Sequence, residues 1–293
     1  LTLAGFMLTL GVFDVFHPLN NGTLVTCAVV SYSFTAGLAG YVSGSVYKQM
    51  EGRMWMRNAV LAAALFCGPV FVIFALLNSV SVLFLDSARV VPLWSALVVV
   101  ILWAVVTFPL TIVGSIFGRN ATKVSRPPCH VNSVARPIPQ TEWYRRPPVM
   151  AAMSGIIPFI SIYLELYYVL QTVWGYKVFS LYEVLALVFF MLLLVVSITT
   201  ISSIYFQLVV EDYRWQWSSF FYGGAVSMYV FGYTFGFFVR SGSSTGSGLV
   251  LHLLHISAYS IILSSMFFLI FGSVGFFCVK LFVYFVFTSV KSD

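Results

Sequence analysis

Apolar runs long enough to cross a lipid bilayer follow one another along almost the whole chain. A membrane-spanning helix needs about 20 predominantly apolar residues. The sequence predicts eight such spans, at about 1–17, 24–47, 58–82, 93–117, 149–173, 181–209, 217–239 and 249–289. The last run would reach about 60 Å as one helix, roughly twice the bilayer core. It is either two spans, with a bend near Gly272 and Gly275, or one tilted helix whose end leaves the membrane.

The composition excludes a soluble protein. Hydrophobic residues make up 60% of the chain and charged residues 8%, whereas soluble domains carry about 25% charged residues. We therefore expect an all-α, polytopic membrane protein, a bundle of about eight transmembrane helices with the lipid bilayer as its surroundings. The net charge of +6 does not indicate a nucleic-acid partner, because the basic residues cluster between the apolar runs.

A polar, proline-rich segment at 119–148 orients the chain. It holds six of the fifteen Lys and Arg residues, and cytoplasmic loops are enriched in these residues. If residue 1 starts on the cytoplasmic side, eleven basic residues face the cytoplasm, namely Lys48, Arg53, Arg57, the six of this segment, Arg214 and Lys291. Three face the other side, namely Arg89, Lys177 and Arg240. The charge bias thus predicts that the 119–148 loop and the 290–293 tail are cytoplasmic.

Ionisable residues inside a bilayer are costly and mark candidate functional positions. Asp14 and Glu165 are the two candidates for intramembrane polar contacts. Asp14 alternatively reaches interfacial water, and Glu165 alternatively forms a hydrogen bond between helices. His252 and His255 share a helix face, but no carboxylate or thiolate near them in sequence completes a metal site.

The sequence contains no catalytic triad, phosphate loop or metalloprotease motif. We therefore expect no enzymatic activity, no cofactor and no metal. Four scattered cysteines predict packing rather than disulfides. Because Leu1 already lies inside an apolar run, we expect the chain to be the C-terminal portion of a longer protein.

Charged residues interrupt two apolar runs at 209–221. Glu211 and Asp212 follow a helix C-terminus, where the helix dipole disfavours negative charge. Arg214 can pair with either carboxylate, so we expect a structured turn on the cytoplasmic side. Small residues cluster at 36–45 and 223–225, which predicts close approach of helices.

Several stretches of the chain resemble a known family, the transmembrane 9 superfamily (nonaspanins, endomembrane protein 70). They are NNGTLVTCAVVSYSFTAGLAGYVSGSVYK at 20–48, LELYYVLQTVWGYKVF at 164–179, YFQLVVEDYRWQWSSF at 205–220, GSVGFF at 272–277 and the terminal VKSD. The resemblance implies a large lumenal domain and one span, both absent from this chain, before the eight spans predicted here. It also implies that 249–289 is a single last span. The chain departs from the family at Trp215–Ser219, where members have a WWWRSF-like string.

The resemblance also implies a function. Family members end in Lys-x-Asp or Lys-x-Glu, a cytosolic signal that coatomer binds, and Lys291 and Asp293 match it. We therefore expect a protein of Golgi and endosomal membranes that sorts other membrane proteins as its cargo. The alternatives are a small-solute or ion transporter that uses Asp14 and Glu165, and a passive assembly scaffold.

Overall fold

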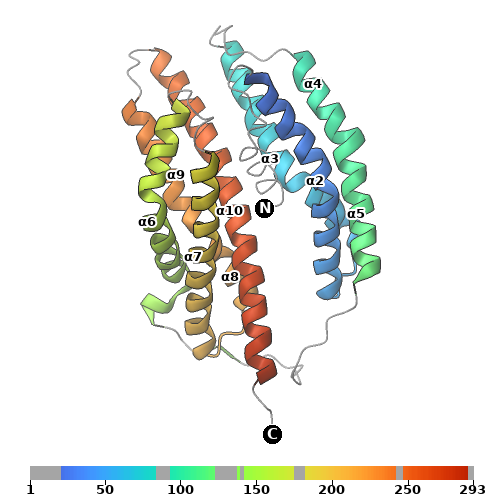
Figure 1. Ribbon diagram of the computed structural model, residues 1–293, viewed down its shortest axis with the longest axis vertical. Helices are drawn as coiled ribbons and strands as arrows, with labels where there is room; N and C mark the ends of the chain where they lie inside the picture. The colour runs from blue at the N-terminus through green and yellow to red at the C-terminus, as the bar shows by residue number, and fades with distance from the viewer. Residues whose placement is uncertain are drawn as a thin grey trace. The chain divides into compact units, whose positions relative to one another are not determined.

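The computed structural model describes residues 21–83, 93–122, 137–138, 142–174, 182–241 and 247–289. Within these residues every regular element is a helix, which confirms the predicted all-α class (Figure 1). Asp14, Lys291, Asp293 and the predicted span at 1–17 lie outside the described residues. The chain forms two compact units, which we describe separately.

The first unit consists of the N-terminal helices and the start of the last helix. Its elements are α2 (Asn21–Gln49), α3 (Trp55–Leu83), α4 (Leu93–Leu102), the π-helix η1 (Trp103–Thr107), α5 (Phe108–Ala121) and residues 247–258 of α10. The segments α4, η1 and α5 follow one another without a gap. Pro109 lies just after the π-helical turn, and a proline that lacks an N–H favours such a local change in hydrogen bonding.

Helices α2 and α5 approach each other through glycines. A Cβ atom added at Gly40 would overlap the carbonyl oxygen of Thr111, and one added at Gly44 would overlap that of Ser115. A Cβ atom added at Gly114, on α5, would likewise overlap the carbonyl oxygen of Gly37 on α2. The small-residue cluster at 36–45 therefore brings two backbones into direct contact, as the sequence predicted.

The second unit contains the remaining helices. Its elements are η2 (Trp143–Arg145), α6 (Pro147–Trp174), α7 (Tyr182–Val209), α8 (Trp215–Gly224), α9 (Val226–Ser241) and residues 259–289 of α10. A short turn at Ala225 separates α8 from α9. The main core joins four helices through buried aliphatic residues and Phe271, namely Ile162, Leu166, Leu170, Leu192, Val196, Val226, Val230 and Phe271.

The last helix, α10, is continuous from Ser247 to Ser289 and has 43 residues. Its length is therefore about 64 Å at 1.5 Å per residue. Gly272 and Gly275 do not break it. Gly272 packs against Phe220, and Gly275 packs against Gly223 and Thr200. The two glycines thus serve helix packing rather than a bend.

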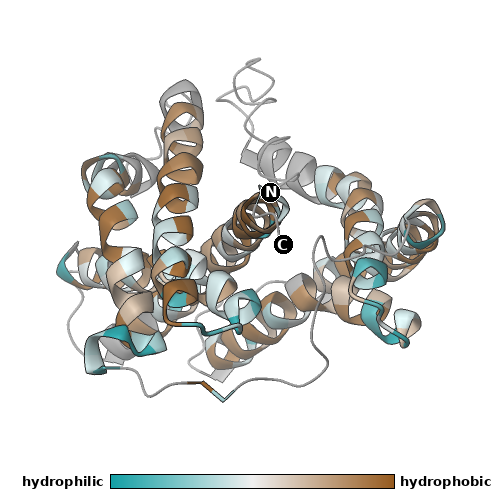
Figure 2. Cartoon of the chain, turned by 90° about the horizontal axis from the view of Figure 1, so that it is seen from below, coloured by the Kyte–Doolittle hydropathy of each residue, from teal (hydrophilic) through white to brown (hydrophobic). Residues whose placement is uncertain are grey.

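The surfaces of the helices suit a lipid environment. Four helices of the described residues are apolar and long enough to cross a membrane, at Trp94–Ala121, Pro147–Tyr168, Ala186–Val209 and Leu253–Ser289. A fifth results if the bent helix α3 counts as one span. Pro69 explains this bend, because its ring conflicts with the carbonyl four residues earlier, on Leu65. Figure 2 shows that hydrophobic residues dominate the helices and that hydrophilic ones gather near their ends.

Candidate functional site: an open groove between α6 and α9

Aromatic residues at four-residue spacing line the contact between α6 and α9. Phe159, Tyr163 and Tyr167 share one face of α6 because residues four apart lie above each other on a helix. Tyr229, Tyr233 and Phe237 do the same on α9. The two rows pair in parallel order, with ring centroids 5.7 Å apart for Phe159–Tyr229, 5.0 Å for Tyr163–Tyr233 and 6.0 Å for Tyr167–Phe237. These distances fall in the favourable range for aromatic pairs.

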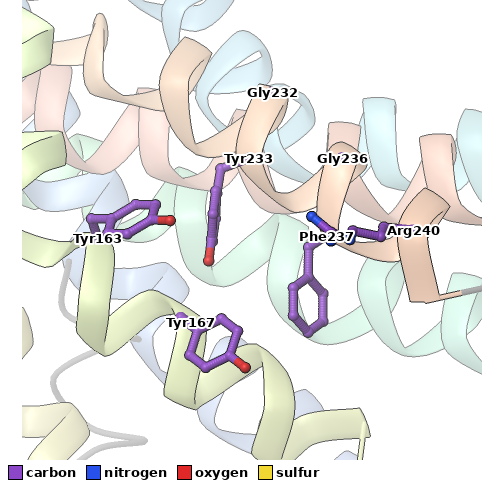
Figure 3. A pocket seen from close by; sticks show the side chains of 7 residues that line it. All are labelled: Tyr163, Tyr167, Gly232, Tyr233, Gly236, Phe237 and Arg240. Carbon is purple, nitrogen blue, oxygen red and sulfur yellow. The ribbon is translucent and has the colours of Figure 1, made fainter.

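A groove of about 620 Å³ opens beside this aromatic ladder. Its wall consists of Tyr163, Tyr167, Gly232, Tyr233, Gly236, Phe237 and Arg240. Figure 3 shows the rings of Tyr163 and Tyr167 on one helix opposite Tyr233 and Phe237 on the other. Arg240 lies at one end of the groove, in the last turn of α9, where a positive charge is favourable for the helix dipole.

The floor of the groove contains two exposed glycines with open space above them. Gly232 and Gly236 are four residues apart, and a Cβ atom added at either would meet nothing within 4 Å. Five other glycines of the second unit pack closely against neighbouring helices, namely Gly155, Gly223, Gly224, Gly272 and Gly275. The G-x-x-x-G face of α9 therefore lacks an internal partner among the described residues. Such a face permits a further helix to come close to the backbone.

Glu165 lies on the same helix as Tyr163 and Tyr167 but is not part of this groove. It is half-buried, and two residues along a helix correspond to a rotation of about 200°. Its neighbours Ile162 and Leu166 belong to the buried core. The structure thus places Glu165 toward the edge of the core rather than opposite Arg240.

The charged segment after α7 forms an ordered turn. Glu211 has a positive φ of 64°. Its N–H donates to the carbonyl of Leu208, and the N–H of Asp212 donates to that of Gln207. This is the Schellman arrangement that satisfies the last carbonyls of a helix. Asp212 accepts a hydrogen bond from the backbone N–H of Arg214 at 3.0 Å.

The remaining candidate residues lie elsewhere. His255 is 3.3 Å from the hydroxyl of Ser81 within the first unit, and the side chain of His252 is outside the described part of the structure. Among the described residues, no three His, Cys, Asp or Glu side chains are grouped as metal ligands. We did not predict the α6–α9 groove from the sequence, although the sequence shows the four-residue spacing of Gly232 and Gly236.

Comparison with known proteins assigns the chain to a family. The endomembrane protein 70 family model matches residues 1–247. Transmembrane 9 superfamily member 4 from Arabidopsis thaliana is 37% identical over 292 residues, which are 100% of this chain and 49% of that protein. Transmembrane 9 superfamily member 1 from Mus musculus is 33% identical over 98% of this chain and 46% of its own length.

A relative with a different name is the putative phagocytic receptor 1b from Dictyostelium discoideum. It is 39% identical over 71% of this chain and 35% of its own length. The chain thus spans about half the length, or less, of these curated relatives. No solved structure is significantly similar to it. The match over nearly the whole chain shows that it belongs to the endomembrane protein 70 family, also called the transmembrane 9 superfamily.

Proposed function

We propose that this chain is the membrane region of a sorting protein that binds the transmembrane helices of other membrane proteins in the groove between α6 and α9. The observation that carries the proposal is the pair of exposed glycines, Gly232 and Gly236, beside a wall of aromatic rings. Family membership supports a multi-pass membrane protein. The receptor name of the Dictyostelium relative is in keeping with a role in binding other molecules.

The groove has the chemistry that helix recognition in a bilayer requires. Lipid tails are as apolar as leucine, so helices associate through close packing and a few polar contacts. The two glycines supply the close approach. The hydroxyls of Tyr163 and Tyr233, which are hydrogen-bonded to each other, and the hydroxyl of Tyr167 supply hydrogen-bonding groups along the same groove. We therefore expect the preferred cargo helix to carry small residues at four-residue spacing.

A second part of the proposal concerns the location of the protein. We propose that Lys291 and Asp293 form a cytosolic signal for coatomer, which keeps the protein in Golgi and endosomal membranes. An ammonium group and two carboxylates on a short terminal segment suit an ionic pocket on a coat subunit. This part of the proposal rests on sequence resemblance and on the predicted cytoplasmic orientation.

Filling the groove tests the proposal. We expect Gly232→Leu with Gly236→Leu, in the full-length protein, to abolish co-purification of a single-span reporter whose helix has glycine at every fourth position. Leucine is the better helix former by up to about 1 kcal/mol per position, and both positions have open space. The loss of binding should therefore occur without loss of stability.

Two controls make the result specific. Ala75→Leu places a leucine side chain at an exposed position of α3 and should leave reporter binding unchanged. A reporter with leucine in place of its glycines should bind weakly to the unaltered protein. Reporter binding that survives the double substitution in the groove would refute the helix-binding proposal.

A further inference from the structure

A second cavity lies where η2, α6 and α7 meet the turn before α8. Its volume is about 180 Å³, well above the space that one water molecule needs. Its lining includes the polar or charged residues Arg145, Gln207, Asp212 and Arg214. It also includes the apolar residues Met150, Phe206 and Val210. The lining of the cavity is therefore amphipathic.

The amide of Gln207 leaves an acceptor without a partner in this region. Its nitrogen donates to Asp212 Oδ2 at 3.1 Å and to the hydroxyl of Ser218 at 3.1 Å, so both amide hydrogens are used. The Ser218 hydroxyl in turn donates to the carbonyl of Arg214. Gln207 Oε1 is buried and has no hydrogen-bond partner among the described residues. A buried acceptor of this kind is costly unless a donor reaches it.

The charge of the cavity favours an anion. Two arginines, Arg145 and Arg214, and one acidic residue, Asp212, line the cavity. Asp212 already accepts hydrogen bonds from Gln207 and from the backbone of Arg214, so two donors stabilise its charge. The guanidinium of Arg145 lies over the ring of Tyr144, with its central carbon 5.5 Å from the ring centroid. Arginine pairs well with phosphate because its planar group donates two parallel hydrogen bonds.

Exposed aromatic residues place the cavity near a membrane surface. Trp143 is 71% exposed and lies two residues before Arg145, and Trp217 is 73% exposed and lies three residues after Arg214. Tryptophan is enriched at the level of lipid headgroups. The charge distribution of the chain predicts that this end faces the cytoplasm, where anionic lipids concentrate.

We propose that this cavity binds the headgroup of a phosphorylated inositol lipid. The phosphate lies between Arg145 and Arg214, and a ring hydroxyl donates to Gln207 Oε1. The apolar wall of Met150, Phe206 and Val210 accommodates the start of the acyl chains. This wall is the reason for assigning a lipid rather than a soluble inositol phosphate, which carries the same phosphate and hydroxyl groups.

Lipid binding to the purified full-length protein tests the proposal. The probes are phosphatidylinositol monophosphate, the corresponding soluble inositol phosphate and phosphatidylserine, each added to the detergent-solubilised protein and followed by native mass spectrometry. We expect the affinity for phosphatidylinositol monophosphate to fall about tenfold for each of Arg145→Gln and Arg214→Gln. Arg146→Gln is the matched control, because Arg146 is adjacent to Arg145 but does not line the cavity.

Each of the other outcomes either supports or refutes lipid binding in this cavity. An equal loss with Arg146→Gln, or no loss with the cavity variants, would overturn the site, and equal binding of the soluble inositol phosphate would overturn the lipid assignment. Phosphatidylserine binding as tightly as phosphatidylinositol monophosphate would overturn the role given to the ring hydroxyl.

If the cavity variants do not fold, a photoactivatable phosphatidylinositol monophosphate is cross-linked to the unaltered protein. Labelling of the peptide around 207–214 supports the proposal, and labelling only elsewhere refutes it.

Discussion

The contact between α2 and α5 makes a quantitative prediction about Gly40. A Cβ atom at this position would lie 2.9 Å from the carbonyl carbon of Thr111 and 3.0 Å from its Cα, and would overlap the carbonyl oxygen. The obstacle is backbone, which cannot rotate away as a side chain can. Gly40→Ala therefore requires the two helices to separate, and we estimate a shift of ~1 Å for ordinary van der Waals contact.

The free energy of this separation follows from the contacts that it loosens. A gap of about 0.5–1 Å removes a quarter to a half of the dispersion attraction of each contact. The loosened contacts include Gly44 with Ser115 and Gly114 with Gly37. Overpacking typically costs about 1–3 kcal/mol, and alanine returns up to about 1 kcal/mol as a better helix former. We expect Gly40→Ala to destabilise the protein by about 2 kcal/mol.

Equilibrium unfolding in mixed detergent micelles with increasing dodecyl sulfate, followed by tryptophan fluorescence, measures this effect. Gly232→Ala is the matched control, because the same methyl group enters open space and should stabilise by up to about 1 kcal/mol. We thus expect the two substitutions to change the free energy of unfolding in opposite directions. A Gly40→Ala protein as stable as the unaltered one, or a Gly232→Ala protein equally destabilised, would refute the packing argument.

Two further predictions concern the turn after α7 and the tail. Glu211→Gly should stabilise the fold by about 1 kcal/mol, because glycine adopts a positive φ without the steric cost that glutamate has at 64°; the same unfolding assay checks it, and a destabilised variant would contradict it. Replacing Lys291 and Asp293 by alanine should move the full-length protein from the Golgi toward the cell surface in imaging. Unchanged Golgi residence would eliminate the proposed coatomer signal.

The sequence predicted the helical class because apolar runs near bilayer length leave few other folds. It also predicted that residues 36–45 pack closely. It did not identify α5 as their partner, because pairing depends on which faces meet in space. The positive φ of Glu211 was likewise not predictable from the sequence, since glycine or asparagine is the usual residue just after a helix C-terminus. Asp14, Lys291 and Asp293 stay predictions, because they lie outside the described residues.

The glycine pairs of α5 and α9 show why the groove itself was not predicted. Gly114 and Gly118 are four residues apart, as are Gly232 and Gly236, so the two patterns are identical in sequence. The first pair packs against the backbone of α2, at Gly37 and Tyr41, whereas the second faces open space. Only the fold shows which pair is already occupied.

A glycine pair with no helix packed against it lowers helix stability without a compensating contact inside the described residues. Each glycine in a helix is about 0.8–1 kcal/mol less favourable than alanine, and at Gly232 and Gly236 no neighbour within 4 Å requires the absence of a side chain. In the α2–α5 contact, close packing of backbones offsets this cost. In α9 the described residues provide no such offset. A partner helix that packs on this face would supply it, so the stability of α9 and the binding of cargo should be coupled through the same two positions.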